Sequence, residues 1–241
     1  MSGHFEGWHW PRVLAESALI VLSILFAFAI EASWSQRNDR VAEAEALQGL
    51  RDDFAANVAR LAESRVEHTE IRDASIRVLA LTGPEAEAPA DLVMDTLVMT
   101  LIGGPKVFAV TATYDALIAS GRIDLLRSST LRRELATWSA ALADLGEEER
   151  EAFSQMDQRL LPFLWDYVPI VTLDINVLED YADVDVRPSR FSRRYDELLQ
   201  SRRFENHVEE RMNSSIRSIA RLTAVQNITQ TVLDLVEEEL R

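Results

Sequence analysis

The apolar run Val13–Ile30 constrains the fold of this 241-residue chain more than any other feature, because it fits lipid better than water. Its few polar residues are Glu16, Ser17 and Ser23. A helix from Pro11 to Trp34 would be long enough to cross roughly 30 Å of hydrocarbon at about 1.5 Å per residue. Tryptophans flank the run on both sides, as they do at membrane interfaces; they are Trp8, Trp10 and Trp34. The sequence therefore predicts an N-terminal tail over residues 1–10, a transmembrane anchor over 11–34 and an extramembrane domain over 35–241.

Two other interpretations of the run are weaker. A cleavable signal peptide would carry a basic segment before the apolar stretch and a small-residue cleavage site after it. No basic segment precedes the run here, and residues 29–33 do not form a clean small-x-small pattern. The third interpretation is a buried core helix of a water-soluble protein. We therefore expect an uncleaved anchor.

Glu16 lies inside the apolar run and allows two interpretations. In the first, its side chain reaches the headgroup region and pairs with Arg12, four residues earlier. In the second, several copies of the chain bring Glu16 together as an acidic ring or a proton-carrying site. The second interpretation predicts an oligomeric channel or transport component.

The charge of the chain excludes several classes of partner and site. Its formal net charge is −15, and such a field repels phosphate backbones, so we expect no nucleic-acid partner. The absence of cysteine excludes disulfides, thiolate metal sites and cysteine nucleophiles.

The basic residues around the apolar run indicate its orientation in the membrane. Arg12 precedes the run, and three arginines follow it, namely Arg37, Arg40 and Arg51. By the positive-inside rule this excess favours a cytoplasmic C-terminal domain.

Composition favours an all-α fold, because helix-forming residues dominate and the chain has only 8 Gly and 7 Pro. Residues 35–81 contain no Pro and only Gly49. Their apolar residues recur at spacings of three and four, which is typical of one face of a helix; they are Leu47, Leu50, Phe54, Val58 and Leu61. We expect a long stalk helix that continues the anchor and ends at the Thr82-Gly83-Pro84 sequence.

Two short helices are expected next. Asp91 is placed to cap a helix that ends before the Gly-Gly-Pro sequence of residues 103–105. Residues 113–120 form the second, which Gly121 would close in a left-handed conformation. Ser128 or Ser129 would then cap a longer helix.

That longer helix is expected to reach Tyr167, with a kink at Pro162. Residues 169–188 are the least helical stretch, and a helical pattern resumes over 192–241. The long helices at the two ends of the domain are expected to pack antiparallel in a helical bundle. A parallel coiled coil between copies is the alternative use of their apolar stripes.

No catalytic or metal-binding motif is apparent. The four histidines lack ligand spacing, and neither a nucleophile elbow nor a phosphate-binding glycine loop is present. The densest acidic cluster lacks the glycine and closing glutamate of a calcium loop; it consists of Asp174, Glu179, Asp180, Asp183 and Asp185. We therefore expect no cofactor, no metal and no catalytic residue.

Two blocks of the sequence carry a resemblance. The first is Ala15-Glu16 followed by LIVLSILFAFAI and the exit EASWSQRND, and the second is TYDALIASGRIDLL over residues 113–126. They resemble the GE-xx-LVV-x-GILIAL span and the TYDELxxSGxLxLI stretch of an uncharacterised family of bacterial single-pass membrane proteins, a domain of unknown function. Ser23 stands where the family often has Gly, and residues 31–33 replace an Asn pair.

The resemblance implies an inner-membrane protein whose C-terminal domain is periplasmic, on the opposite side from the one that the charges favour. We follow the resemblance and keep the cytoplasm as the alternative. The family carries no assigned activity. From the residues themselves, the second block predicts either ordinary packing or a small polar constellation at a helix end, composed of Tyr114, Asp115, Ser120 and Arg122 beside Gly121.

These features together predict a membrane-anchored helical interaction or scaffold module without enzymatic activity. Its expected partners are the lipid bilayer and either further copies of the chain or another envelope protein. The alternatives are the channel that uses Glu16 and a membrane-bound enzyme that uses the polar constellation or the acidic cluster.

Overall fold

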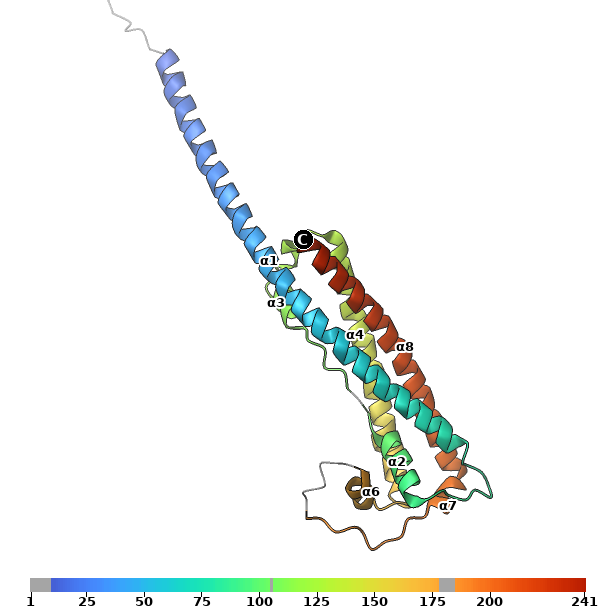
Figure 1. Cartoon of the computed structure of the whole chain (residues 1–241). Helices are drawn as coiled ribbons and strands as arrows, with labels where there is room; N and C mark the ends of the chain where they lie inside the picture. The colour runs from blue at the N-terminus through green and yellow to red at the C-terminus, as the bar shows by residue number, and fades with distance from the viewer. Residues whose placement is uncertain (1–9, 105, 178–184) are drawn as a thin grey trace, which may run out of the picture.

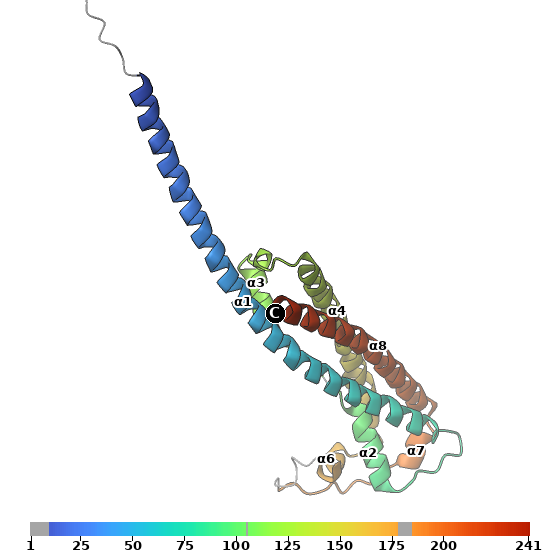
Figure 2. The same ribbon diagram turned by 45° about the horizontal axis from the view of Figure 1, so that its top comes forward.

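The computed structural model describes residues 10–104, 106–177 and 185–241. Over these residues the secondary structure is helical and contains no strand, which confirms the expected all-α fold. One helix, α1 (Trp10–Leu79), accounts for the long arm and for one edge of the bundle (Figures 1 and 2). At about 1.5 Å per residue it is roughly 105 Å long.

The arm is the part of α1 up to Val41, and its described side chains are all exposed. Its apolar side chains are exposed, with Leu22 at 65% and Phe26 at 70% of their full accessible surface. This part is long and apolar enough to cross a membrane, and none of it is buried within the chain. The interpretation as a buried core helix is therefore wrong, because a core helix would have packing partners.

Burial on α1 begins near Glu43 and continues to the end of the helix. The expected apolar face is buried at Leu47, Leu50, Phe54 and Leu61, whereas Val58 is only half-buried. The fully buried position beside it is the polar residue Asn57. The stalk helix thus continues from the apolar arm without a break, as its uninterrupted sequence predicts.

Two further long helices complete the bundle: α4 (Ser129–Gln155) and α8 (Arg202–Glu239). Helix α8 packs along both α1 and α4 and runs antiparallel to them (Figure 1). This arrangement confirms the antiparallel packing expected for the two long helices at the ends of the domain. Ser128 caps α4 and Ser201 caps α8, each by accepting a hydrogen bond from a backbone N–H three residues later.

The shorter helices cover the two ends of the bundle. Helix α3 (Ala112–Ala119) and the 3₁₀ turn η1 (Ile123–Leu125) lie near the arm. At the opposite end lie α2 (Asp91–Ile102), α5 (Leu161–Leu164), α6 (Ile170–Val177) and α7 (Tyr195–Leu199) (Figure 2). The loop after α1 closes this end, where Gly83 N–H donates to Leu199 O at 3.1 Å.

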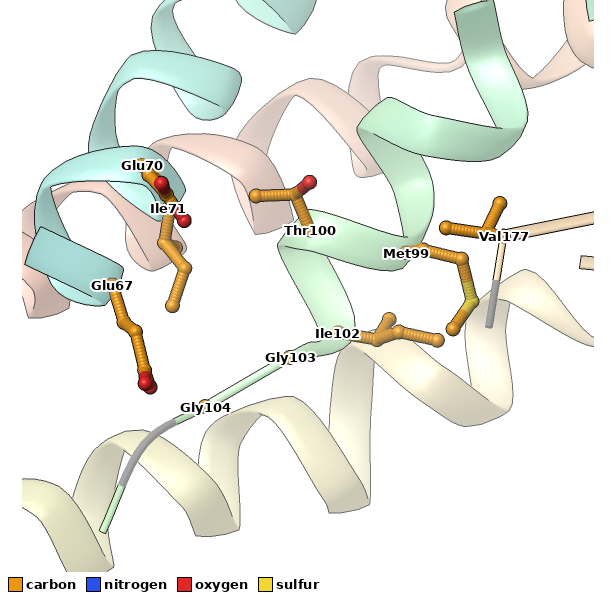
Figure 3. A pocket seen from close by; sticks show the side chains of 9 residues that line it. All are labelled: Glu67, Glu70, Ile71, Met99, Thr100, Ile102, Gly103, Gly104 and Val177. Carbon is orange, nitrogen blue, oxygen red and sulfur yellow. The ribbon is translucent and has the colours of Figure 1, made fainter. Parts of the chain in front are cut away.

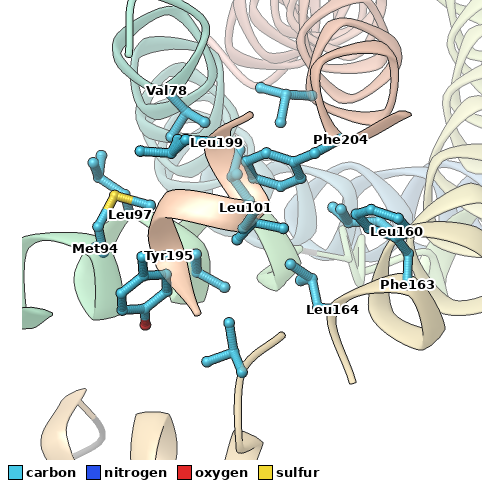
Figure 4. Close-up of a cluster of buried hydrophobic side chains, with 14 of the residues drawn as sticks. Val78, Met94, Leu97, Leu101, Leu160, Phe163, Leu164, Tyr195, Leu199 and Phe204 are labelled. Atoms are coloured by element: carbon cyan, nitrogen blue, oxygen red, sulfur yellow. The ribbon is translucent and has the colours of Figure 1, made fainter. Parts of the chain in front are cut away.

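The core consists of two hydrophobic clusters. The near cluster, beside α3, contains Leu50, Phe54 and Trp138. The far cluster contains Val78, Leu101, Leu164 and Phe204, drawn in Figure 4. Between them both α1 and α8 carry buried polar residues, namely Ser64 and His68 on α1 and Arg211, Ser214, Ser215 and Ser218 on α8. A polar layer therefore divides the core of the bundle.

Two expected helix boundaries are wrong. Ala90 rather than Asp91 precedes α2, and no side chain caps that helix. The helix from Ser129 does not reach Tyr167, because α4 gives way to a π-helical turn, η2 (Met156–Leu160), and then to α5. Pro162 has no N–H to donate back into the preceding turn, so the wider turn falls where a kink was expected.

The stretch 169–188, expected to be the least helical, contains α6. This helix is rich in β-branched residues and owes its formation to packing against α2 rather than to propensity. In the last segment the helical pattern is interrupted at Gln200 and Ser201, where α7 ends and α8 begins.

Candidate functional site

The polar constellation expected at residues 114–122 is engaged within and around α3. Gly121 has φ +67° and closes the helix as predicted: its N–H donates to Ile118 O at 3.0 Å, and Arg122 N–H donates to Leu117 O at 2.9 Å. This pair of hydrogen bonds is a Schellman motif. The backbone of Arg122 thus takes part in ending the helix.

The remaining members of the constellation have local partners too. Ser120 Oγ donates to Ala116 O at 2.6 Å, and Asp115 accepts from Thr111 Oγ1 at 2.6 Å. Tyr114 packs edge-on against Trp138, with ring centroids 6.1 Å apart. These contacts support the packing interpretation of the block, and a functional role for it stays a prediction.

Glu16 lies on the exposed apolar arm of α1. The Arg12 side chain is outside the described residues, so the expected pair stays a prediction. Residues 178–184, which hold most of the expected acidic cluster, also lie outside the described residues. Asp174 belongs to α6 and Asp185 lies beyond the gap. Within the described chain no group of three or more acidic or histidine side chains could hold a metal ion.

A different candidate site lies at the linker between α2 and α3, residues 103–111. Side chains from all three long helices hold this linker by its backbone. Asn57 binds both the N–H and the C=O of Val110, and Arg60 Nη1 donates to Phe108 O at 2.6 Å. From α4, Glu149 Oε2 accepts the Val107 N–H at 3.2 Å.

Arg211 on α8 completes this set of contacts. Its guanidinium donates to Leu101 O at 2.9 Å and also to Gly103 O, where α2 ends. Burial lowers the pKa of Arg211 to about 10, so it remains charged at neutral pH. Four polar side chains thus fix the course of the linker beside α1.

Two pockets that share the lining residue Glu67 lie along α1 where the linker passes it. The first pocket has a volume of about 460 Å³ and lies between α1, the end of α2 and the linker (Figure 3). It is lined by Glu67, Glu70, Ile71, Met99, Thr100, Ile102, Gly103, Gly104 and Val177. The second pocket, of about 310 Å³, is lined by Arg60, Glu63, Ser64, Glu67, Lys106, Val107 and Phe108. Glu67 belongs to both pockets, and we call the pair the α1 groove.

The charges of the two pockets differ. The first pocket is lined by the carboxylates Glu67 and Glu70 and by no basic residue. Burial raises the pKa of Glu67, and the neighbouring Glu63 and Glu70 raise it further. In the second pocket two acidic residues face two basic ones. The α1 groove is therefore negative at one end and balanced at the other.

The basic residues of the second pocket are engaged with the chain itself. Arg60 is bonded to the linker backbone, and Lys106 Nζ lies 4.5 Å from the centroid of the Phe153 ring. Phe108 is 72% exposed at the same place. Ser64 is 5% exposed, and its hydroxyl has no protein hydrogen-bond partner. This hydroxyl is buried behind the wall of the pocket and is not accessible from it.

Other buried side-chain atoms without a hydrogen-bond partner in the described chain are both ring nitrogens of His68, Oε1 of Glu149, Oγ of Ser218 and Nε2 of His207. Burial, with a smaller contribution from Arg211, lowers the pKa of His68 to about 4. His68 is therefore neutral at physiological pH.

Comparisons of the chain with family models, with curated proteins and with solved structures gave no match. The first pocket of the α1 groove combines apolar walls with two carboxylates. Such a combination can bind a ligand that presents both a positive charge and an apolar surface.

Sequence reasoning did not single out the residues of this groove. Glu63, Glu67 and Glu70 resemble an ordinary solvated helix face, because the linker that makes them part of a pocket follows more than thirty residues later. Asn57 could have been noticed, since it interrupts an apolar stripe at a buried position.

Proposed function

We propose that the protein is a membrane-anchored helical interaction module that carries no enzymatic activity. The observation that carries this proposal is the continuity of α1. One helix presents exposed apolar side chains over its first part and packs its apolar face into the bundle over its last part. A helix of this kind suits an anchor that is rigidly joined to the domain it carries.

The geometry of α1 supports a spacing role. At about 1.5 Å per residue, Glu67 lies roughly 50 Å along the helix from Trp34, which we place at the membrane interface. With α1 upright, the α1 groove would be held well beyond the lipid headgroups. The partner that it serves is therefore a protein or solute away from the bilayer rather than a lipid.

We further propose the bacterial inner membrane as the location, with a single pass of the chain. The family resemblance favours a periplasmic domain, and the count of basic residues favours a cytoplasmic one. The net charge of −15 is consistent with a soluble domain on either side that avoids anionic lipid surfaces.

The proposal is tested on the full chain with a C-terminal tag, expressed in bacteria. After alkaline carbonate extraction of the membranes, the tagged chain is expected in the pellet. Crosslinking in intact membranes is expected to give discrete larger adducts. Release by carbonate would contradict the anchor, and a chain that stays monomeric at every crosslinker length would contradict the interaction module.

A further inference from the structure

We propose that the α1 groove binds a basic segment of a partner protein, seating an arginine or lysine side chain in the pocket beside Glu67 and Glu70. This inference rests on the proposed function, since it names the chemistry of the partner that the module would engage.

The first pocket combines two features that an arginine or lysine side chain requires. Such a side chain is an aliphatic stem with a positive head. The stem would lie against the apolar walls formed by Ile71, Met99 and Ile102, and the head would meet Glu67 and Glu70. No basic side chain is among the described residues that line this pocket, and the Arg211 guanidinium next to Gly103 is already bonded to Leu101 O and Gly103 O.

The second pocket suits the backbone that carries such a side chain. Its two acidic and two basic residues balance, so it favours a neutral polar group over a second cation. Phe108, exposed at the edge, offers an apolar contact.

The length of the groove also favours a peptide. Its α1 side extends from Arg60 to Ile71, which is about 16 Å at the helical rise. An extended chain rises about 3.3 Å per residue, so about five residues would fit along it. A free amine would fill only one end.

The test uses the full-length protein in detergent and a fluorescein-labelled hexapeptide of alternating leucine and arginine. A matched peptide replaces each arginine by citrulline, which has almost the same shape and no charge. Fluorescence anisotropy is expected to show saturable binding of the arginine peptide, at least about tenfold tighter than that of the citrulline peptide. Equal binding of the two peptides, or no saturable binding, would overturn the proposal.

Variants locate the binding on the protein. Glu67→Gln with Glu70→Gln is expected to abolish most of the preference for arginine. Glu237→Gln with Glu238→Gln removes the same charge from exposed positions at the opposite end of the bundle and is expected to leave the preference unchanged. Equal losses in both variants would mean that the acidity of the whole chain attracts the peptide, and the site would be refuted.

Two further measurements separate the remaining outcomes. If n-hexylamine binds more tightly than the arginine peptide, the ligand is a free amine and the proposed peptide is wrong; weak competition by n-hexylamine supports the proposal. Carbonate extraction of the Glu67→Gln, Glu70→Gln variant is expected to match the wild type. A failure of peptide binding is thereby distinguished from a failure of the membrane anchor.

Discussion

Asn57 on α1 binds both backbone groups of Val110, a residue 53 positions later in the chain. Its Nδ2 donates to Val110 O at 2.9 Å, and its Oδ1 accepts the Val110 N–H at 2.7 Å. Asn57 has no exposed surface. One buried amide therefore satisfies a stretch of linker that has no secondary structure of its own, and it keeps the linker beside α1 to form the groove.

The Asn57→Asp variant tests this role with almost no change in shape. Its carboxylate keeps the acceptor for the Val110 N–H but turns the donor into a second acceptor facing Val110 O. We expect the free energy of unfolding at pH 7 to fall by about 2–4 kcal/mol, measured by urea denaturation in detergent. Asn227→Asp, at an exposed position on α8, is the control and should change stability little. A small effect at both positions would contradict the role of Asn57.

Gly49 and Gly146 form a second matched pair. A Cβ on Gly49 would lie 2.8 Å from Thr113 Oγ1 and 3.0 Å from Cγ2, so rotation of the threonine cannot relieve the contact. A Cβ on Gly146 would meet nothing within 4 Å. We expect Gly49→Ala to destabilise the fold by about 1–3 kcal/mol and Gly146→Ala to stabilise it by about 0.5–1 kcal/mol.

The same urea titration checks the glycine pair. Adding Thr113→Ala to Gly49→Ala should restore much of the lost stability, because it removes both crowding atoms. If Gly49→Ala were as stable as Gly146→Ala, the close approach of α1 and α3 would be wrong.

His68 predicts an acid-sensitive core. Its pKa is about 4 in the folded chain and about 6.5 when unfolded, so the unfolded state binds the proton more readily. Its contribution to the free energy of unfolding is complete above pH 6.5 and is lost as the pH falls towards 4. At pH 5 the loss is about 2 kcal/mol. The stability difference between pH 7 and pH 5 should therefore shrink by about that amount in His68→Leu.

The matched control for this prediction is His207→Leu. Burial lowers the pKa of His207 too, but Glu210 partly opposes the shift. Its effect on the pH dependence should be smaller than that of His68→Leu. An unchanged pH dependence in His68→Leu would show that His68 is not kept neutral by the fold.

The raised pKa of Glu67 predicts that its carboxylate lowers the stability of the fold at pH 7. Its raised pKa means that the folded state favours the protonated carboxyl, so its stabilising effect is present below about pH 4 and is lost as the pH rises through the folded pKa. At pH 7 the Glu67→Gln variant should therefore melt slightly higher than the wild type, on the order of 1–2 °C, and this gain should vanish near pH 4. Differential scanning calorimetry measures both values, with Glu85→Gln, an exposed loop variant, as the control. A lower melting temperature at pH 7 would contradict the charge repulsion.

Much of the fold follows from the sequence because local signals and packing agree there. The left-handed turn at Gly121 and the Ser128 cap each rest on one residue type in one position, and the unbroken stalk rests on the absence of proline over residues 35–81. Helix α6 was not foreseen, because its residues favour strands and only the contact with α2, including Asn176 Nδ2 donating to Asp95 at 2.8 Å, makes the helix stable.

The groove could not be predicted from the sequence for a related reason. Periodicity finds the apolar face of a helix, but a buried Asn57 or Glu43 is not part of that pattern. Glu43 is 4% exposed and accepts hydrogen bonds from both the backbone and the guanidinium of Arg127, 84 residues later. Such partners belong to the tertiary structure alone.

The anchor itself is tested most directly by cysteine accessibility, because the natural chain contains no cysteine. Leu22→Cys and Phe26→Cys replace side chains that the fold leaves exposed, and Val41→Cys replaces one at 55% exposure beyond the apolar run. In isolated membranes a water-soluble maleimide should label Val41→Cys and leave the first two variants unlabelled until detergent and denaturant are added. Rapid labelling of Leu22→Cys and Phe26→Cys in intact membranes would show that α1 does not enter the bilayer.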